Sequence, residues 1–272
     1  MLTATTRSPN NWAIKYKRSM NRIEIGPSQE FSFGGENFVI ALPVKERRLS
    51  TSDAFTIAKN EPYLRVYEEL ASVFSPRSIL ELGILQGGSY VLLDKLFSPR
   101  RMSAVDIRPQ PVPQLLAYIA DKEGRFVHFS ASQTDRKILE DIVRNELADE
   151  LDLVVDDASH TYEQTKASFE ILFPLLKPGG IYAIEDWSWA HSPNYQERDA
   201  PFSKRHALSN LLFEQLMLMG STSLISEIRV WKFLYLIRKA TTVIPAPDQG
   251  QKDEGGSIFD QILNRGREWS LI

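Results

Sequence analysis

The chain has 272 residues, of which 43% are apolar and 25% are charged, and its formal net charge is −3. This composition is typical of a globular protein without an electrostatic preference for polyanions, so we expect neither nucleic acid nor a membrane as a partner. The absence of cysteine excludes disulfides and thiolate metal sites. The sequence shows neither an apolar run long enough to cross a bilayer nor the apolar core of a secretory signal, which favours a cytoplasmic location.

Residues 1–50 are expected to form an arm and a small cap outside the main domain. Residues 1–22 are polar and basic with little periodicity, which is typical of a mobile or partner-dependent segment. The stretch EFSFGGENFVIAL, residues 30–42, alternates apolar and polar side chains around Gly34 and Gly35. Two glycines at this spacing favour a tight hairpin, because both can take a positive φ.

Residues 51–240 are expected to form the main domain. Apolar side chains recur at helical spacing from Ser52 to Phe74 around Pro62, which predicts a helix or a helix pair. Short apolar runs then alternate with helical stretches, the order expected of a parallel sheet with crossover helices. The predicted strands are 78–84, 101–107, 125–131, 151–157 and 179–186, and the predicted helices are 89–97, 112–122, 134–147 and 161–176. The fold class is therefore α/β, a doubly wound, Rossmann-like, mostly parallel sheet.

The last part of the domain differs from the rest. The stretch LISEIRVWKFLYLIRKA, residues 224–240, indicates two strands after a helix at about 205–219. No crossover helix fits between these two strands, so at least one of them should pair antiparallel. Residues 241–272 are typical of a linker and a short terminal segment. This segment and the N-terminal arm are candidates for contacts in a homo-oligomer.

The loop after the first long strand carries the first binding motif, ELGILQGGS. Gly83 lets the chain turn sharply, Gly87 and Gly88 let the backbone approach a ligand, and Ser89 can cap the next helix. The spacing is not the G-x-G-x-x-G of dinucleotide-binding loops, and Glu81 would repel a diphosphate. The motif therefore favours a nucleotide-like ligand with a cationic group over NAD.

Asp106 ends the second strand, about 20 residues beyond Gly83, the offset at which a carboxylate accepts hydrogen bonds from ribose hydroxyls. We predict that it binds a diol. The alternative is that Asp106 only closes a strand.

Two adjacent pairs of carboxylates end consecutive strands. Asp156 and Asp157 follow one strand, and Glu185 and Asp186 follow the next. Because the carboxyl ends of parallel strands share one edge of a sheet, the pairs should lie close together and repel unless a cation binds. Oxygen ligands predict Mg²⁺, or otherwise Ca²⁺ or Mn²⁺. His160 follows closely and is a candidate general base for a hydroxyl acceptor.

A purely structural alternative remains open for each of these residues. Asp157 or Ser159 could cap the helix that begins near Thr161, His160 could be an ordinary loop residue, and the second acidic pair could merely end its strand. The accumulation of like charge without basic neighbours in the sequence favours a functional site.

The motifs resemble the class I S-adenosylmethionine-dependent methyltransferases over roughly residues 60–240. Within that class, DLVVDDASH, FPLLKPGGIYAIEDW and IRVWKFLYLIRKA resemble the metal-dependent sugar O-methyltransferases of antibiotic biosynthesis, a group that includes the macrolide O-methyltransferases and the cephalosporin hydroxylase-like proteins.

The resemblance implies an S-adenosyl-L-methionine site, a Mg²⁺ site and a catalytic base. The implied cofactor-binding residues are Glu81, Gly83, Gly87, Ser89, Asp106, Ser132, Gln133 and Asp156. The implied metal ligands are Asp157, Glu185 and Asp186, with His160 and Asp157 as catalytic residues. The expected acceptor is a hydroxyl of a small molecule, either a sugar of a glycosylated natural product or a phenolic or polyketide group. A nicotinamide-dependent oxidoreductase and a non-catalytic binding module are the alternatives.

The region after the last acidic pair, WSWAHSPNYQERDAPFSKRHA, has little regularity and is typical of a lid or a substrate-binding loop. Trp187, Trp189 and Tyr195 could stack on a sugar or an aromatic aglycone. Core packing or a subunit contact would explain each of these aromatic residues equally well.

Overall fold

The computed structural model describes residues 22–42, 48–200 and 203–241. Its strands are β1 (Glu30–Phe33), β2 (Glu36–Ile40), β3 (Phe55–Ile57), β4 (Ser78–Leu82), β5 (Arg101–Asp106), β6 (Arg125–Phe129), β7 (Leu151–Asp156), β8 (Leu176–Glu185), β9 (Ile225–Val230) and β10 (Leu234–Lys239). Its α-helices are α1 (Glu61–Val73), α2 (Gly88–Phe97), α3 (Pro113–Ile119), α4 (Arg136–Asp141), α5 (Tyr162–Leu172) and α6 (Ser209–Ser221), and α4 continues into a π-helical turn, Ile142–Glu146.

The main sheet has seven strands in the order β6-β5-β4-β7-β8-β10-β9. Strands β4 to β8 pair in parallel, whereas β10 pairs antiparallel with both β8 and β9. The central strands are buried on both faces, which explains why their sequences are mostly apolar. The predicted fold class, including the antiparallel end of the sheet, is confirmed.

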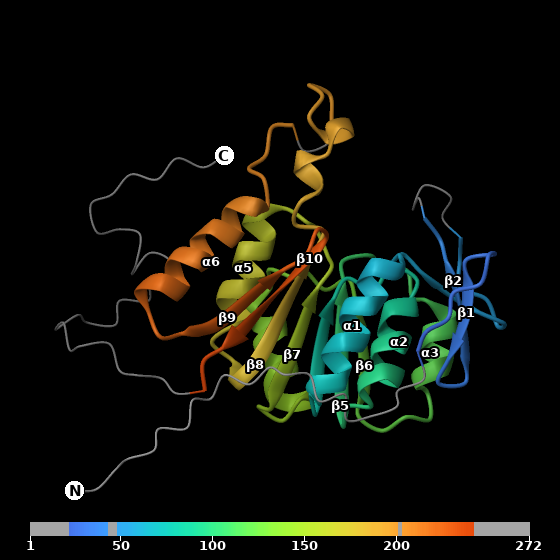
Figure 1. Ribbon diagram of the computed structural model, residues 1–272. Coiled ribbons are helices and arrows are strands. Elements are labelled where there is room, and N and C mark those ends of the chain that lie inside the picture. The colour runs from blue at the N-terminus through green and yellow to red at the C-terminus, as the bar shows by residue number, and fades with distance from the viewer. Residues whose placement is uncertain (1–21, 43–47, 201–202, 242–272) are drawn as a thin grey trace, which may run out of the picture.

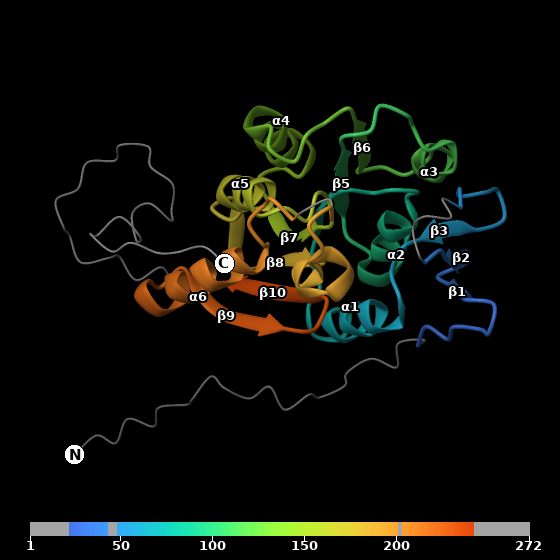
Figure 2. The same cartoon turned by 90° about the horizontal axis from the view of Figure 1, so that it is seen from above.

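Helices cover both faces of the main sheet (Figures 1 and 2). Helices α1, α2 and α3 contribute to one hydrophobic core, and α4, α5 and α6 contribute to the other. Because side chains alternate along a strand, β4 serves both cores: Leu80 and Leu82 enter the core of α4 to α6, and Ile79 enters the core of α1 to α3. Glu81 therefore lies on the face that α1 and α2 cover.

The predicted hairpin at Gly34 and Gly35 is confirmed, with φ angles of 58° and 86°. Its second strand, β2, pairs in parallel with β3. The segment around β3 packs directly on α2, since a Cβ at Gly88 would overlap the carbonyl group of Thr56. The small sheet is thus attached to the glycine-rich loop of the main domain.

The prediction of a helix or helix pair from Ser52 was wrong for its first part. Residues 55–57 form β3, and α1 begins only at Glu61, with Asn60 as its N-cap. Pro62 lies in the first turn, where its missing N–H costs no hydrogen bond, so it starts the helix instead of interrupting one. Strand β3 forms because β2 offers it a free edge, which apolar spacing alone does not reveal.

Among the described residues, no helix is both long and apolar enough to cross a membrane. The predicted domain boundaries at residues 50 and 240 stay predictions. The N-terminal arm up to residue 21 and the C-terminal segment from residue 242 lie outside the described residues.

Candidate active site

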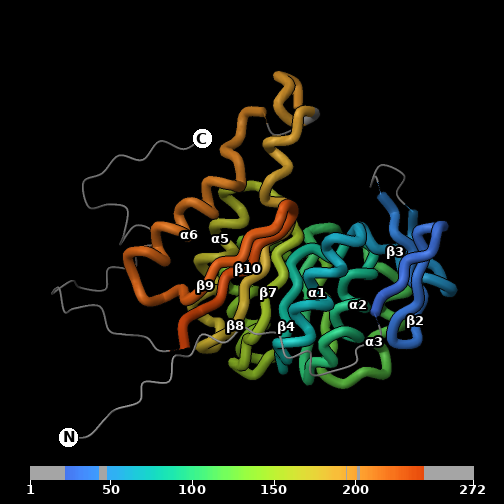
Figure 3. The backbone as a smooth tube through the Cα atoms, viewed as in Figure 1, coloured from blue at the N-terminus to red at the C-terminus, as the bar shows by residue number. Residues whose placement is uncertain are grey.

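A cavity of about 670 Å³ opens at the carboxyl ends of the parallel strands, a size that suits a ligand pocket. Five successive strand ends each contribute a wall residue: Gly83, Asp106, Gln133, Asp157 and Asp186. The loop after β8, which projects beyond this end of the sheet, forms a further wall (Figure 3). The strand-end loops predicted to carry function therefore meet in one cavity.

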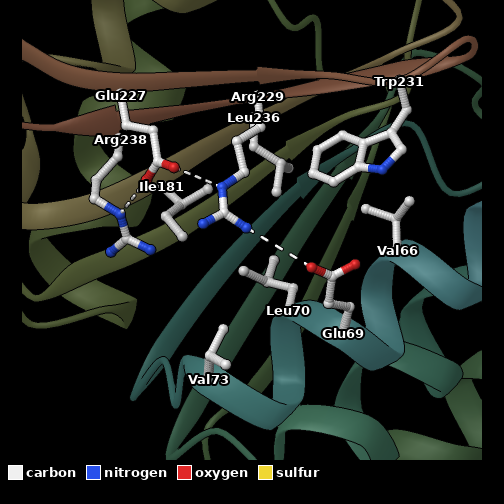
Figure 4. Close-up of a pocket in the computed structure, with 10 residues that line it drawn as sticks. All are labelled: Val66, Glu69, Leu70, Val73, Ile181, Glu227, Arg229, Trp231, Leu236 and Arg238. Atoms are coloured by element: carbon white, nitrogen blue, oxygen red, sulfur yellow. Dashed lines mark hydrogen bonds and ion pairs between the residues drawn. The ribbon is translucent and has the colours of Figure 1, made fainter. Parts of the chain in front are cut away.

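A second hollow, between α1 and the strands β9 and β10, is too small for a comparable role. Its volume is about 20 Å³, and its rim is occupied by ion pairs (Figure 4). Arg229 pairs with Glu227 and with Glu69 on α1, and Arg238 also pairs with Glu227. These contacts fasten α1 to the end of the sheet.

The glycine-rich loop passes very close to the strand end that carries Asp157. Gly83 has a φ of 84°, and a Cβ at this position would overlap the Asp157 carbonyl oxygen and lie 2.8 Å from the Ala158 Cα. The Asp157 amide donates to the Leu82 carbonyl at 2.9 Å. The carboxyl ends of β4 and β7 are thereby held together.

Substituting Gly83 by alanine is expected to destabilise the protein by about 3 kcal/mol or more, because a strained φ and a backbone overlap combine. Gly35 is a matched control: its φ is also positive, but a Cβ there meets nothing within 4 Å. Gly35→Ala should cost only about 1 to 2 kcal/mol of backbone strain. Urea unfolding of both variants measures the difference, and equal losses would contradict the close approach.

The predicted cap at Ser89 was wrong. Helix α2 begins at Gly88 with Gly87 as its N-cap, at a φ of 80°, so Ser89 lies inside the first turn. Ser89 instead lines the cavity. It remains available to a ligand at the N-terminus of the helix.

Asp106 lines the cavity and organises the glycine-rich loop. Its Oδ2 accepts from the amides of Ile84 and Leu85 at 3.1 and 3.2 Å. Arg108 pairs with the same carboxylate at 2.8 Å. Burial opposes ionisation, but the hydrogen bonds from Arg108 and from the loop amides hold the pKa of Asp106 below its usual value. Asp106 is therefore a carboxylate, and its binding of a diol stays a prediction.

The structure separates Asp156 from the cavity wall. Its carboxylate accepts from Ser168 at 2.6 Å, from Tyr182 at 3.0 Å and from Gln133 at 3.2 Å. Burial raises the pKa of Asp156 to about 6, although the hydrogen bonds from Ser168 and Tyr182 oppose the rise. Ser132 and Gln133 do line the cavity. Asp156 is thus placed behind Gln133 and can orient it, while Gln133 and Ser132 are the groups that a ligand can reach.

Asp157, His160 and Asp186 form a cluster with the geometry of a metal site: one ligand atom from each residue lies within 4.8 Å of the other two. His160 Nε2 is 3.8 Å from Asp157 Oδ1 and 3.6 Å from Asp186 Oδ2. His160 and Asp186 both have a positive φ, of 55° and 53°. Side chains from two strand ends converge here, as the sequence predicts.

Glu185, the third predicted metal ligand, points away from the cluster of Asp157, His160 and Asp186. Its Oε2 accepts from Lys59 Nζ at 2.5 Å, and its Oε1 accepts from the Tyr67 hydroxyl at 2.5 Å. Lys59 also pairs with Asp157 Oδ2 at 2.6 Å, and the Tyr63 hydroxyl donates to Asp186 Oδ1. Sequence reasoning missed all three partners: the two tyrosines fit the apolar stripe of α1, and nothing in the sequence marks Lys59.

The charges at the site are unbalanced. Burial, with the nearby charge of Asp157, raises the pKa of Glu185 to about 8, and Lys59 only partly opposes the rise. Burial also raises the pKa of Glu81 to about 8, although the charge of Lys59 and the nearby Ser89 hydroxyl oppose the rise. Among the described residues, neither carboxylate oxygen of Glu81 has a hydrogen-bond partner of good geometry. Lys59 itself is protonated, because the two carboxylates it contacts outweigh the effect of burial on its pKa. With one ammonium among four acidic side chains, of which Glu81 and Glu185 hold a proton more readily than usual, the site suits additional cationic groups that would stabilise the ionised forms.

Aromatic side chains form the outer wall of the cavity. Tyr63 stacks on Phe233 with ring centroids 5.5 Å apart, and Trp189 meets Tyr195 edge-on at 4.6 Å. The Trp189 indole also donates to the His160 carbonyl at 3.2 Å. Trp187 does not belong to this wall, because its indole donates to the Trp231 carbonyl and its ring packs on Tyr235. Of the three aromatic candidates, two remain for acceptor binding.

Residues 80–187 match a family model described as a methyltransferase domain. A rhamnosyl tetracenomycin-C 2'-O-methyltransferase of Streptomyces olivaceus is 28% identical over 49% of this chain and 35% of its own length. The mycinamicin VI 2''-O-methyltransferase of Micromonospora griseorubida is 30% identical over 43% of this chain and 29% of its own length. The chain thus aligns with only about a third of these relatives.

Two solved structures show the same fold. The O-methyltransferase TomG of Streptomyces achromogenes has a TM-score of 0.51 at 18% identity, covering 72% of this chain and 86% of its own. A putative caffeoyl-CoA O-methyltransferase of Staphylococcus aureus has a TM-score of 0.52 at 15% identity, covering 72% of this chain and 88% of its own.

Proposed function

We propose that this chain is a metal-dependent O-methyltransferase that uses S-adenosyl-L-methionine, because residues 80–187 match a methyltransferase-domain model. The observation that carries the proposal is the cluster of Asp157, His160 and Asp186, which opens into the same cavity as the glycine-rich loop. The proposed acceptor is a hydroxyl on a sugar of a glycosylated natural product. The names of the relatives and the aromatic outer wall support this choice.

The inner half of the cavity is the proposed site for the methyl donor. S-adenosylmethionine supplies an electrophilic methyl group on a sulfonium, whose positive charge suits the excess of carboxylates. Glu81 is fully buried and does not line the cavity, whereas its neighbours Gly83 and Ser89 do. On binding of the donor it would accept from the amino group, which would give its carboxylate oxygens a partner. Asp106 would accept from the ribose hydroxyls, and Ser132 and Gln133 would contact the adenine. Gly83 and Ser89 line the cavity and would give the donor close access to the backbone of the glycine-rich loop. Gly87 does not line the cavity, because it faces the Leu115 side chain.

The outer half of the cavity is the proposed site for the metal and the acceptor. A hard divalent cation such as Mg²⁺ supplies a Lewis acid that lowers the pKa of a neighbouring hydroxyl. Asp157 Oδ1 and Asp186 Oδ2 would hold it, since their other oxygens contact Lys59 and Tyr63. Glu185, implied as a ligand by the family, can join only if Lys59 releases it.

His160 is the proposed general base. An alcohol is a poor nucleophile while protonated, so its proton must leave as the oxygen gains the methyl group. His160 Nε2 faces Asp157 and Asp186 and would take this proton. The hydrogen bond from Trp189 to the His160 carbonyl holds the backbone that carries the base. The cavity otherwise contributes by bringing acceptor and donor together in line.

The test is a methyl-transfer assay with S-adenosylmethionine, Mg²⁺ and a panel of rhamnosides and other glycosides. The release of S-adenosylhomocysteine is the readout. Transfer to a sugar hydroxyl that EDTA abolishes and added Mg²⁺ restores is the expected result. Transfer that survives EDTA would contradict the metal. Thermal stabilisation by NAD but not by S-adenosylhomocysteine would instead indicate the oxidoreductase alternative.

Glu81→Gln is expected to weaken S-adenosylhomocysteine binding about 10- to 100-fold, because a charge-assisted hydrogen bond to the amino group is lost. Calorimetry on the purified protein measures this affinity. Glu146→Gln is the control: this carboxylate accepts from His128 and Ser103, outside the cavity. Unchanged affinity in Glu81→Gln would remove Glu81 from the donor site.

A further inference from the structure

Lys59 lies between two of the three residues that the family resemblance assigns to the metal. Its Nζ is 2.6 Å from Asp157 Oδ2 and 2.5 Å from Glu185 Oε2. The side chains of Lys59 and Glu185 are only 3% and 2% exposed, so their contact is shielded from water, whereas the Asp157 side chain is 23% exposed. A buried ammonium therefore occupies carboxylate oxygens that a cation would otherwise use.

Lys59 and the strands β2 and β3 that position it precede residues 80–187, the segment that matches the methyltransferase-domain model. Lys59 follows β3, which is paired with β2 and packed on α2 through Thr56. Tyr67 of α1 binds the remaining oxygen of Glu185. The part of the chain that precedes the matched domain thus supplies both groups that engage Glu185.

Only some of the carboxylate oxygens at this site remain available to a metal ion. Lys59 takes Asp157 Oδ2, and Tyr63 takes Asp186 Oδ1. Asp157 Oδ1 and Asp186 Oδ2 are the oxygens that face His160. Mg²⁺ prefers six oxygen ligands, so an ion held by two carboxylate oxygens would keep several waters and bind weakly.

We propose that Lys59 competes with the divalent cation for Asp157 and Glu185 and thereby makes the metal site one of low affinity. The inference rests on the metal site of the proposed function. It goes beyond that function by assigning a residue that sets the affinity of the site for the metal. An ammonium and a divalent ion repel each other, and they cannot share the same carboxylate oxygens. Tight binding through Glu185 therefore requires that Lys59 leave.

The test is the affinity of the full-length protein for Mn²⁺, measured by electron paramagnetic resonance of the free ion. Lys59→Met removes the ammonium and keeps the apolar stem. It is expected to lower the Kd for Mn²⁺ at least about tenfold. Lys232→Met removes an exposed ammonium from the rim of the same cavity and should change the Kd less than about twofold.

A second comparison covers the case in which Lys59→Met does not fold because Glu185 is left unpaired. Glu185→Gln is compared with the double variant Lys59→Met/Glu185→Gln, which leaves no unpaired carboxylate at residue 185. Removal of Lys59 should again tighten Mn²⁺ binding, now through Asp157 alone. Equal or weaker binding after removal of Lys59 in either background would overturn the competition.

The same samples separate this inference from the proposed function. Wild-type protein that binds Mn²⁺ with an affinity that Lys59→Met leaves unchanged would overturn only the role of Lys59. A complete lack of Mn²⁺ binding in every variant would overturn both the competition and the metal site. Calorimetry with S-adenosylhomocysteine tests the donor site independently of either result.

Discussion

Replacement of His160 by alanine is expected to lower kcat for methyl transfer about 100- to 10,000-fold, the usual contribution of a general base. The base would be lost, while the donor half of the cavity, around Gly83, Asp106 and Gln133, would remain. The affinity for S-adenosylhomocysteine should therefore stay within about twofold of the wild type. Initial rates at saturating S-adenosylmethionine and calorimetry measure the two effects.

A second histidine provides the control for this loss. His191 lies in the loop after β8, where its Nε2 contacts Ser209 at 2.7 Å, and it does not line the cavity. His191→Ala should keep kcat within about twofold, because no reacting group lies near it. If His160→Ala retained a third or more of the wild-type kcat, His160 could not be the base.

Asp186→Asn is expected to lower the Mg²⁺-dependent rate at least about 100-fold, because an anionic oxygen ligand becomes a neutral one and stabilisation worth several kcal/mol is lost. Asp186 also accepts from Tyr63, and an asparagine oxygen can keep that bond. The variant should therefore fold normally. Rates measured across a Mg²⁺ titration, together with thermal unfolding, separate loss of the metal from loss of structure.

Asp199→Asn is the matched control, since Asp199 is an exposed carboxylate in the same loop. Its Mg²⁺ dependence should equal that of the wild type. A Mg²⁺ titration of Asp186→Asn that coincided with the wild-type curve would exclude Asp186 from the metal site.

The fold could be predicted because its central signals are local. Runs such as LVV, residues 153–155, are apolar at consecutive positions, as is typical of strands buried on both faces, and they alternate with amphipathic helices. The antiparallel pairing at the end of the sheet followed from the short connection between the last two strands, whereas the position of β10 beside β8 did not. The methyltransferase family indicated by these motifs agrees with the match of residues 80–187 to a methyltransferase-domain model.

The grouping of Asp157, His160 and Asp186 could also be predicted, because residues at the ends of neighbouring parallel strands must share one edge. The orientation of individual side chains could not. Asp156 and Asp157 are adjacent, so they point to opposite faces, and only the tertiary contacts with Ser168 and Tyr182 show which of the two faces inward.

Lys59 shows the limit of sequence reasoning most clearly. Its partners Asp157 and Glu185 are 98 and 126 residues away in the chain. Neither hydrophobic spacing nor a motif connects such positions, and the strand that orients Lys59 depends on pairing with a hairpin from another part of the chain. Long-range contacts of this kind decide which carboxylates a cation can reach.

The most direct test of the site is diffraction at the manganese edge from crystals grown with S-adenosylhomocysteine and Mn²⁺. We predict an anomalous peak about 2.2 Å from a carboxylate oxygen of Asp157 and from one of Asp186, with the thioether of the bound product in the same cavity. A product-bound cavity that gave no peak between these carboxylates, at Mn²⁺ concentrations that support turnover, would contradict the metal-dependent mechanism.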